Sequence, residues 1–239
     1  MKNPTLQTAA FVWPAAFVWP AAFVWPAAFV WTLALMWTLA ATNASAAPIE
    51  ASAVAAIPGA QAYQDSYDLE AGGKLEEALV ALRGVPTGEQ GTYVFALRKA
   101  WLNHTTGRYD AAIKGYQEAM GLAPSAVEPK LGIMLPQMAL RRWLDVEKSA
   151  QAVLGVDAKS YLGTSRLAFA LYNLGRYAEA EKQYRAILVA YPSDVEMRAG
   201  LAWSLLQRGE RSAAAKEFSN VLGVAPRHAS AAAGARAAQ

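Results

Sequence analysis

The chain has 239 residues, no cysteine and a formal net charge of +3, and 54% of its residues are hydrophobic. Without cysteine it has no disulfides, thiol catalysis, Cys-based metal sites or lipid-modified cysteine anchor. The small net charge argues against a nucleic-acid partner, and the composition is that of a foldable chain with one or two domains.

Residues 1–46 differ in kind from the rest of the chain. Lys2 is their only charged residue, and the hexapeptide AAFVWP occurs three times in succession before a fourth, partial copy. A basic start, a long apolar segment and the small residues Ala44, Ser45 and Ala46 are typical of a secretory signal peptide. We therefore predict a signal peptide over 1–46, lengthened by tandem expansion and cut before Ala47, and an exported protein that is periplasmic or secreted.

A retained membrane anchor is the alternative for this segment, because the apolar run over 9–41 is long enough to cross a bilayer. Pro14, Pro20 and Pro26 weaken it, since each removes a helical hydrogen bond and bends the segment. If it is retained, the protein is anchored to the inner membrane, and membrane contact occurs only through this N-terminal segment. Residues 47–58, rich in Ala and containing two prolines, are predicted to be a linker.

From residue 59 onward one pattern returns every 34 residues. The clearest copy, Tyr161 to Asp194, indicates two short helices that meet at Gly175, each with apolar residues on one side at helical spacing. Pro192 ends the second helix, and Asp194 offers a cap to the next one. The position of Gly175 is filled in all five copies by the residues Gly73, Gly107, Arg141, Gly175 and Gly209.

Two further positions agree across the five copies. Small residues follow the glycine by five positions, and mostly large residues follow four positions later. They are Ala78, Ala112, Val146, Ala180 and Ala214, then Leu82, Tyr116, Ala150, Tyr184 and Phe218. In these repeated positions the sequence over about 59–228 resembles the tetratricopeptide repeat (TPR) family. The resemblance implies an all-α fold, an α-solenoid of about five 34-residue helix-turn-helix repeats over 59–239, wound as a right-handed superhelix.

The third repeat and the C-terminal tail depart from the pattern. In the third repeat Arg141 replaces the glycine, and Pro136 lies inside the first helix, where we expect a bend or an interruption and the lowest local stability of the array. The Ala-rich tail is predicted to form a capping helix over Phe218 and Leu222, because the end of a stacked array needs a cover.

No pattern in the chain indicates catalysis. It has no phosphate-binding glycine loop, no nucleophile elbow and no paired histidines at metal-ligand spacing. The two histidines, His104 and His228, lie in different repeats. We expect a protein that is not an enzyme, with no catalytic residue, metal or cofactor.

The first helices carry apolar and aromatic residues on a second side. In the family that this sequence resembles, the first helices line a concave groove, so we expect an apolar, aromatic ladder that binds a peptide or helix of a partner protein. The predicted groove residues are Tyr63, Tyr67, Leu97, Trp101, Leu135, Phe169, Tyr172 and Trp203. The alternative is that these side chains stack between adjacent repeats and bury one another.

A cation recurs at the turn between the two helices. The residues are Lys74, Arg108, Arg142 and Arg176. Their positive charge complements the carboxyl end of the first helix. Alternatively, they form an edge that meets an anionic surface, such as lipid headgroups or an acidic partner.

These features together predict an exported, non-enzymatic scaffold or adaptor of the cell envelope, with another protein as its partner and no nucleic-acid partner. Two alternatives remain open. One is a membrane-anchored scaffold whose repeats serve self-association. The other is a carrier or chaperone for an apolar ligand held in the groove.

Overall fold

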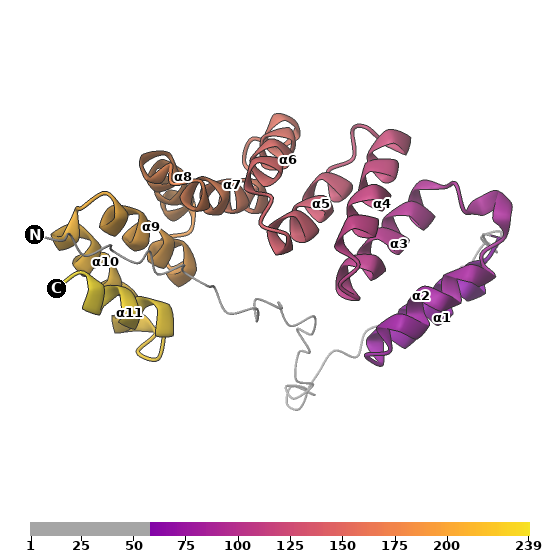
Figure 1. Cartoon of the computed structure of the whole chain (residues 1–239), viewed down its shortest axis with the longest axis horizontal. Helices are drawn as coiled ribbons and strands as arrows, with labels where there is room; N and C mark the ends of the chain where they lie inside the picture. Colours follow the sequence, from indigo (N-terminus) through magenta and orange to yellow (C-terminus); the bar gives the residue numbers. More distant parts are fainter. Residues whose placement is uncertain (1–57) are drawn as a thin grey trace, which may run out of the picture. The chain divides into compact units, whose positions relative to one another are not determined.

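A computed structural model of the chain describes residues 58–239, which are helical apart from their turns and two short 3-10 segments (Figure 1). The helices are α1 (Ala60–Ala71), α2 (Leu75–Ala81), α3 (Tyr93–Thr105), α4 (Tyr109–Leu122), α5 (Glu128–Ala139), α6 (Trp143–Val156), α7 (Tyr161–Asn173), α8 (Tyr177–Ala190), α9 (Val195–Gln207), α10 (Arg211–Val224) and α11 (Ala229–Ala237). The predicted signal peptide and all but the last residue of the predicted linker lie outside the described residues. None of the helices described is both long and apolar enough to span a bilayer.

The helices form five consecutive pairs, from α1/α2 to α9/α10, and each helix packs against the next one in the chain. We call these pairs repeats 1 to 5, and the odd-numbered member of each is its first helix. α11 follows repeat 5 and packs on α10 and α9. The predicted all-α solenoid with a C-terminal capping helix is confirmed.

All five turns inside the repeats have the same backbone geometry. Gly73, Gly107, Gly175 and Gly209 have φ between 75° and 83°, and Arg141 has φ 55°. A left-handed residue at this place ends the first helix. The N–H groups that follow then donate to the last free carbonyls of that helix. Glycine adopts this conformation without strain, which explains its recurrence every 34 residues.

The third repeat keeps its helices despite its unusual sequence. α5 continues for three residues beyond Pro136, so the helix is not interrupted there, and the expected bend stays a prediction. Pro136 is fully buried, and its carbonyl accepts a hydrogen bond from the Leu140 N–H at 3.0 Å. The expected low stability of this repeat stays a prediction.

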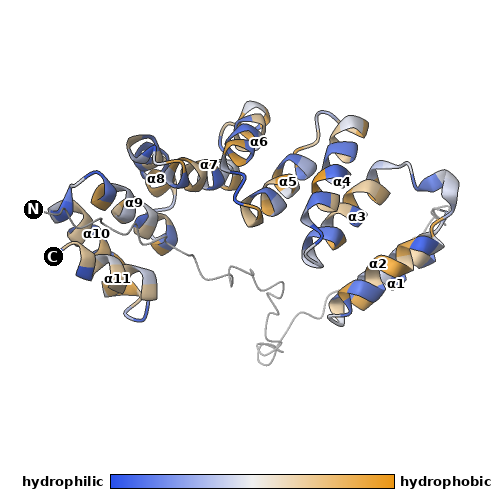
Figure 2. Ribbon diagram, viewed as in Figure 1, coloured by the Kyte–Doolittle hydropathy of each residue, from blue (hydrophilic) through white to orange (hydrophobic). Residues whose placement is uncertain are grey.

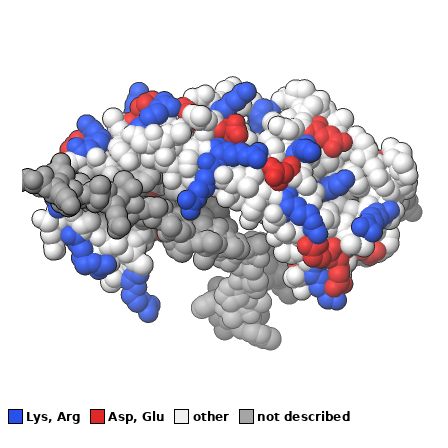
Figure 3. Space-filling view, in the orientation of Figure 1, with Lys and Arg blue, Asp and Glu red and all other residues white. Residues whose placement is uncertain are grey.

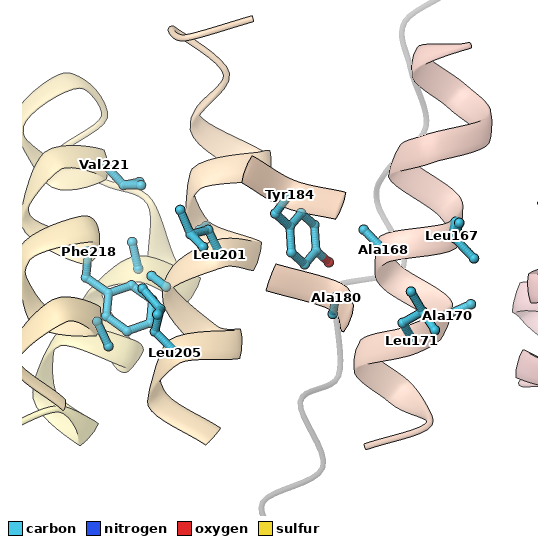
Figure 4. Packing of buried hydrophobic residues seen from close by; sticks show 14 of the residues in the cluster. Leu167, Ala168, Ala170, Leu171, Ala180, Tyr184, Leu201, Leu205, Phe218 and Val221 are labelled. Carbon is cyan, nitrogen blue, oxygen red and sulfur yellow. The ribbon is translucent and has the colours of Figure 1, made fainter. Parts of the chain in front are cut away.

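Two junctions between repeats, and the junction of repeat 5 with α11, share a ring-on-glycine contact. An aromatic side chain of a second helix lies against a glycine in the helix that follows: Tyr116 on Gly132, Tyr184 on Gly200 and Phe218 on Gly234. A Cβ atom added to these glycines would come within 2.3, 2.5 and 2.1 Å of the respective ring. Only glycine lets the helices approach this closely. Figure 4 shows the Phe218 and Tyr184 rings packed among the small and branched residues of neighbouring helices.

The buried apolar side chains form three clusters within the described residues. The largest runs without a break from Met134 to Ala238 and is called the C-terminal core. Two smaller clusters, the N-terminal cores, lie around Leu82 and Phe95 in repeats 1 and 2 and around Tyr116 and Ile133 in repeats 2 and 3. Along each helix hydrophobic and hydrophilic residues alternate, as expected when one side of the helix is buried (Figure 2).

Candidate functional site

A pocket with a volume of about 640 Å³ opens on the first helices of repeats 1 to 4. The first helices α1, α3, α5 and α7 all contribute to its lining. Four of the predicted groove residues lie together here, namely Tyr67, Leu97, Trp101 and Leu135. Apolar side chains thus form much of the wall, and Glu70, Arg98, Glu128 and Arg166 supply its charges.

One end of the pocket is held together by an arginine between α1 and α3. Arg98 is only 5% exposed, and its Nη2 donates to the Ser66 carbonyl at 2.9 Å. Its guanidinium forms an ion pair with Glu70 and lies over the Tyr67 ring, 3.8 Å from the ring centre. The other Glu70 oxygen accepts a hydrogen bond from the Trp101 indole N–H at 2.5 Å. This cluster therefore holds the Tyr67 and Trp101 side chains in place in the unbound protein.

At the start of α5 a second carboxylate is also engaged. The Tyr93 hydroxyl donates to Glu128 Oε2 at 2.5 Å and links repeat 2 to repeat 3. Burial, together with this hydrogen bond and the negative charge, raises the pKa of Tyr93 to about 12. The phenol therefore keeps its proton at neutral pH and remains the donor.

Arg166 reaches the pocket from α7. Its Nη1 donates to the Leu131 carbonyl at 2.5 Å. Burial lowers the pKa of Arg166 to about 10, so the guanidinium still carries its charge at neutral pH. The Tyr116 ring lies beneath the pocket against Gly132, and burial raises the pKa of its phenol.

The remaining predicted groove residues lie against neighbouring helices. Tyr63 packs on the first N-terminal core, and Tyr172 packs edge-on to Tyr177. The Phe169 ring meets Trp143 edge-on with centroids 5.4 Å apart. Trp203 donates its indole N–H to Ser230 of α11 at 2.9 Å, and its ring meets that of Phe218. The aromatic ladder is therefore divided between the pocket and the packed part of the array.

The recurring arginines at the turns reach back to the preceding repeat. Their ion pairs are Arg108–Glu76 at 2.6 Å, Arg142–Asp110 at 2.8 Å and Arg176–Glu147 at 2.7 Å, while Lys74 lies 3.6 Å from Glu77 in its own repeat. Exposed pairs of this kind contribute little to stability, because water and salt screen them. On the face shown in Figure 3 positive and negative side chains are interspersed. Contact of this edge with an anionic surface stays a prediction.

The two histidines have separate environments. His228 caps α11 by accepting the Ala231 N–H at its Nδ1, 3.0 Å away. His104 lies beside the Trp101 ring, and its buried Nδ1 has no hydrogen-bond partner among the described residues. Burial lowers the pKa of His104, and the positive charge of Arg166 lowers it further. Within residues 58–239 no three His, Asp or Glu side chains gather as a metal site would require.

Glu70, Arg98, Tyr116 and Arg166 are pocket residues that the sequence analysis did not identify. A signal for two of them was present at the 34-residue spacing. The position that holds glycine in Gly132 and Gly200 holds arginine in Arg98 and Arg166. At these two junctions the facing second-helix residue is Leu82 or Ala150, which is smaller than the tyrosine or phenylalanine of the other junctions.

The geometry defines a class: a stack of helical hairpins with a pocket on one face of its first helices. Family comparison identifies which class of stack this is. One tetratricopeptide repeat model matches residues 95–125, and another matches 138–195 and 165–229, together slightly more than half of the chain. The chain belongs to the tetratricopeptide repeat family. Such proteins are generally non-enzymatic, and the fold is that of a protein–protein interaction scaffold.

Solved structures of similar fold also match the chain. A tetratricopeptide repeat protein from Parabacteroides merdae ATCC 43184 matches with 21% identity and a TM-score of 0.61, covering 69% of this chain and 64% of its own. Residues 41 to the end of MamA from Desulfovibrio magneticus RS-1 match with 15% identity and a TM-score of 0.66, covering 73% and 99%. YrrB, described as a TPR protein with an unusual peptide-binding site, matches with 14% identity and a TM-score of 0.62, covering 71% and 88%. At these identities the likeness shows the fold alone, and no curated protein sequence matches the chain.

Proposed function

We propose that this protein is an exported scaffold of the cell envelope that holds a segment of a partner protein in the pocket on its first helices. The pocket carries the proposal, because three repeats contribute apolar and aromatic side chains to one surface and the fourth adds Arg166. YrrB, which shares the fold, is described as having a peptide-binding site. That description supports a peptide as the ligand class here.

The aromatic residues of the wall are suited to a binding role. Trp101 is 37% exposed and Tyr67 is 52% exposed. Both are nonetheless held in one orientation by the Arg98–Glu70 ion pair. A fixed aromatic side chain loses little conformational entropy on binding, and exposed aromatic residues are frequent energetic centres of protein interfaces.

A protein segment suits the pocket better than an apolar small molecule. The lining includes Glu70, Arg98, Glu128 and Arg166. A purely apolar ligand would remove water from these groups without supplying hydrogen bonds, which costs free energy. A peptide brings its own backbone and side-chain polar groups, so we favour a protein partner over a lipid carrier role.

The pocket is tested by site-specific photocrosslinking in cells. A benzophenone side chain placed at Leu97, inside the pocket, is expected to give discrete adducts with another protein. The same group at Val189, which is 85% exposed on α8 and outside the pocket, is the matched control. The Trp101→Ala variant should lower the Leu97 adducts about tenfold or more, as expected for loss of a central aromatic anchor. Adducts between copies of this chain alone would favour the oligomerisation alternative, and the absence of any protein adduct would refute the pocket as a partner site.

Export is tested separately, because it rests on the sequence of residues 1–46. The protein is recovered from the envelope of a bacterial host, and its first residues are determined by Edman degradation. We expect the mature chain to begin at Ala47. Recovery of any AAFVWP hexapeptide would refute cleavage and favour the retained anchor.

A further inference from the structure

Unlike Arg98 and Glu70, which pair with each other, Arg166 forms no ion pair with a side chain of the described residues. Arg98 is paired with Glu70, and Glu128 accepts the Tyr93 hydroxyl. The Leu131 carbonyl is the sole acceptor that the described part of the chain gives Arg166, and no carboxylate of that part forms an ion pair with it.

The burial of Arg166 makes this missing partner costly. A guanidinium has five N–H donors, and its charge is expensive to remove from water unless those donors are satisfied. A single carbonyl satisfies one of them. The remaining donors belong to a side chain that lines the pocket. A bound anion would therefore gain a charge-assisted, two-pronged contact without competing against an internal carboxylate.

Tyr116 places a second donor beside the same surface. Its ring is buried against Gly132, yet the residue lines the pocket together with Arg166. Its hydroxyl has no hydrogen-bond partner within residues 58–239; burial raises the pKa of this phenol, and the positive charge of Arg166 opposes that rise. A side chain at Gly132 would displace the ring, so the glycine preserves this arrangement.

We propose that Arg166 and Tyr116 bind the carboxylate of an Asp or Glu side chain within an otherwise apolar segment of the partner protein. The apolar neighbours of that residue lie against Tyr67, Trp101 and Leu135. An internal side chain is the source, because the pocket crosses the first helices of four repeats and so accommodates a continuing length of chain. This inference rests on the proposed function of the pocket.

The test is a selection of short random peptides, displayed with fixed sequences on both sides so that no free carboxyl terminus is present. The bait is the full chain as exported. Peptides selected on the unmodified protein should carry one Asp or Glu flanked by apolar residues and should bind Trp101→Ala weakly. Replacing that acid by its amide should weaken binding to the unmodified protein by roughly ten- to a hundredfold, as expected for losing a hydrogen-bonded charge pair.

Two variants assign the effect to Arg166. On Arg166→Gln the acidic peptide and its amide should bind equally, whereas Arg227→Gln removes an exposed charge outside the pocket and should preserve the preference. Circular dichroism and thermal unfolding of each variant verify that it folds. If Arg166→Gln does not fold, the acid-to-amide comparison on the unmodified protein decides alone.

The possible outcomes separate this inference from the proposed function. Selected peptides that require Trp101 but show no preference for an acid would overturn the carboxylate site and leave the partner-binding pocket in place. If a peptide binds only when its sequence ends in a free carboxyl terminus, the bound carboxylate is a chain end and not a side chain. That result would overturn the proposal. If no peptide is selected, both the pocket function and the carboxylate site are refuted.

Discussion

The two halves of the array use the same sequence position in opposite ways. In repeats 4 and 5 the aromatic residues Phe169 and Trp203 pack edge-on against Trp143 and Phe218, beside a core that is continuous to the C-terminus. In repeat 2 Trp101 stands 34 residues before Leu135 in the same register, yet it lines an open pocket. What differs is the surroundings that the neighbouring helices provide, so a repeated aromatic residue is not by itself a binding residue.

The junctions between repeats are of two kinds. Where a glycine follows an aromatic residue, as in Gly200 on Tyr184, the helices approach closely. Where arginine replaces the glycine, as in Arg98, polar contacts join α1 to α3 beside an apolar cluster that spans the same joint. The N-terminal half therefore adds fixed polar contacts and an open pocket to its apolar contacts.

The largest effect is expected from breaking the C-terminal core at its end. Phe218 is fully buried beneath α11, so Phe218→Ala should lower the free energy of unfolding by about 3–5 kcal/mol. Urea unfolding measures the loss, and hydrogen exchange should show α11 losing protection first. The same substitution at Phe169, which is only partly buried, is the control and should cost less. Equal losses at the two sites would contradict a special role for the capping contact.

A second substitution tests the glycine junctions directly. Gly200→Ala would place a Cβ atom 2.5 Å from the Tyr184 ring and should cost about 1–3 kcal/mol through overpacking. Gly155→Ala is the matched control, because that helical glycine has no atom of a neighbouring helix within 4 Å of the added Cβ. It should raise stability by about 0.5–1 kcal/mol. Chemical denaturation of both variants gives the two signs, and a stabilising Gly200→Ala would invalidate the ring-on-glycine account.

The polar joint of the N-terminal half is tested by Arg98→Met. The change leaves the Glu70 carboxylate and the buried Ser66 groups without their partner and should cost about 1–3 kcal/mol. We expect hydrogen exchange to accelerate in α1 and α2 while α7 to α10 keep their protection. If all helices lose protection against exchange equally, the two halves unfold as one unit and are less distinct than their separate cores indicate.

Most of the fold could be predicted from the sequence, because the constraints repeat. The left-handed turn favours glycine, which fills it at Gly73, Gly107, Gly175 and Gly209, and the period fixes the helix pairs. Asp194 also caps α9 as expected, accepting the Met197 N–H at 3.0 Å. A feature that recurs five times can be recognised without knowing any contact.

The pocket could be predicted only in part, because it depends on departures from the repeat. Leu97 and Trp101 were identified from their spacing. Tyr116 and Arg166 also stand in repeated positions, but their place in the pocket depends on their local surroundings, and Glu70 acts through its contacts with its two neighbours on α3. Pro136 illustrates the opposite error. A local rule predicted a bend or an interruption, and the helix continues without interruption past a fully buried proline.

The third repeat offers a smaller, stabilising test where the two halves meet. Arg141 has φ 55°, a conformation that costs an L residue about 1 kcal/mol and glycine very little. Arg141→Gly should therefore raise the free energy of unfolding by about 1 kcal/mol, or the melting temperature by about 2–4 °C. Arg141→Ala is the control and should not stabilise, because alanine bears the same strain. Equal stabilisation by both variants would show that the lost charge, and not the backbone, is responsible.

The smallest expected effect is a pH dependence confined to the pocket half. Burial, and secondarily Arg166, lowers the pKa of His104 below its ordinary value of 6.5, so the unfolded chain takes up a proton at higher pH than the folded chain does. The contribution of His104 to stability is therefore complete above about pH 6.5 and is lost as the pH falls below it toward the folded pKa. Urea unfolding at about pH 7.5 and about pH 5 should show a smaller loss for His104→Gln than for the unmodified chain. If the two proteins lose the same stability between these pH values, protonation of the His104 imidazole costs nothing in the folded state. Water would then reach the imidazole more freely than the burial of its unpaired Nδ1 indicates.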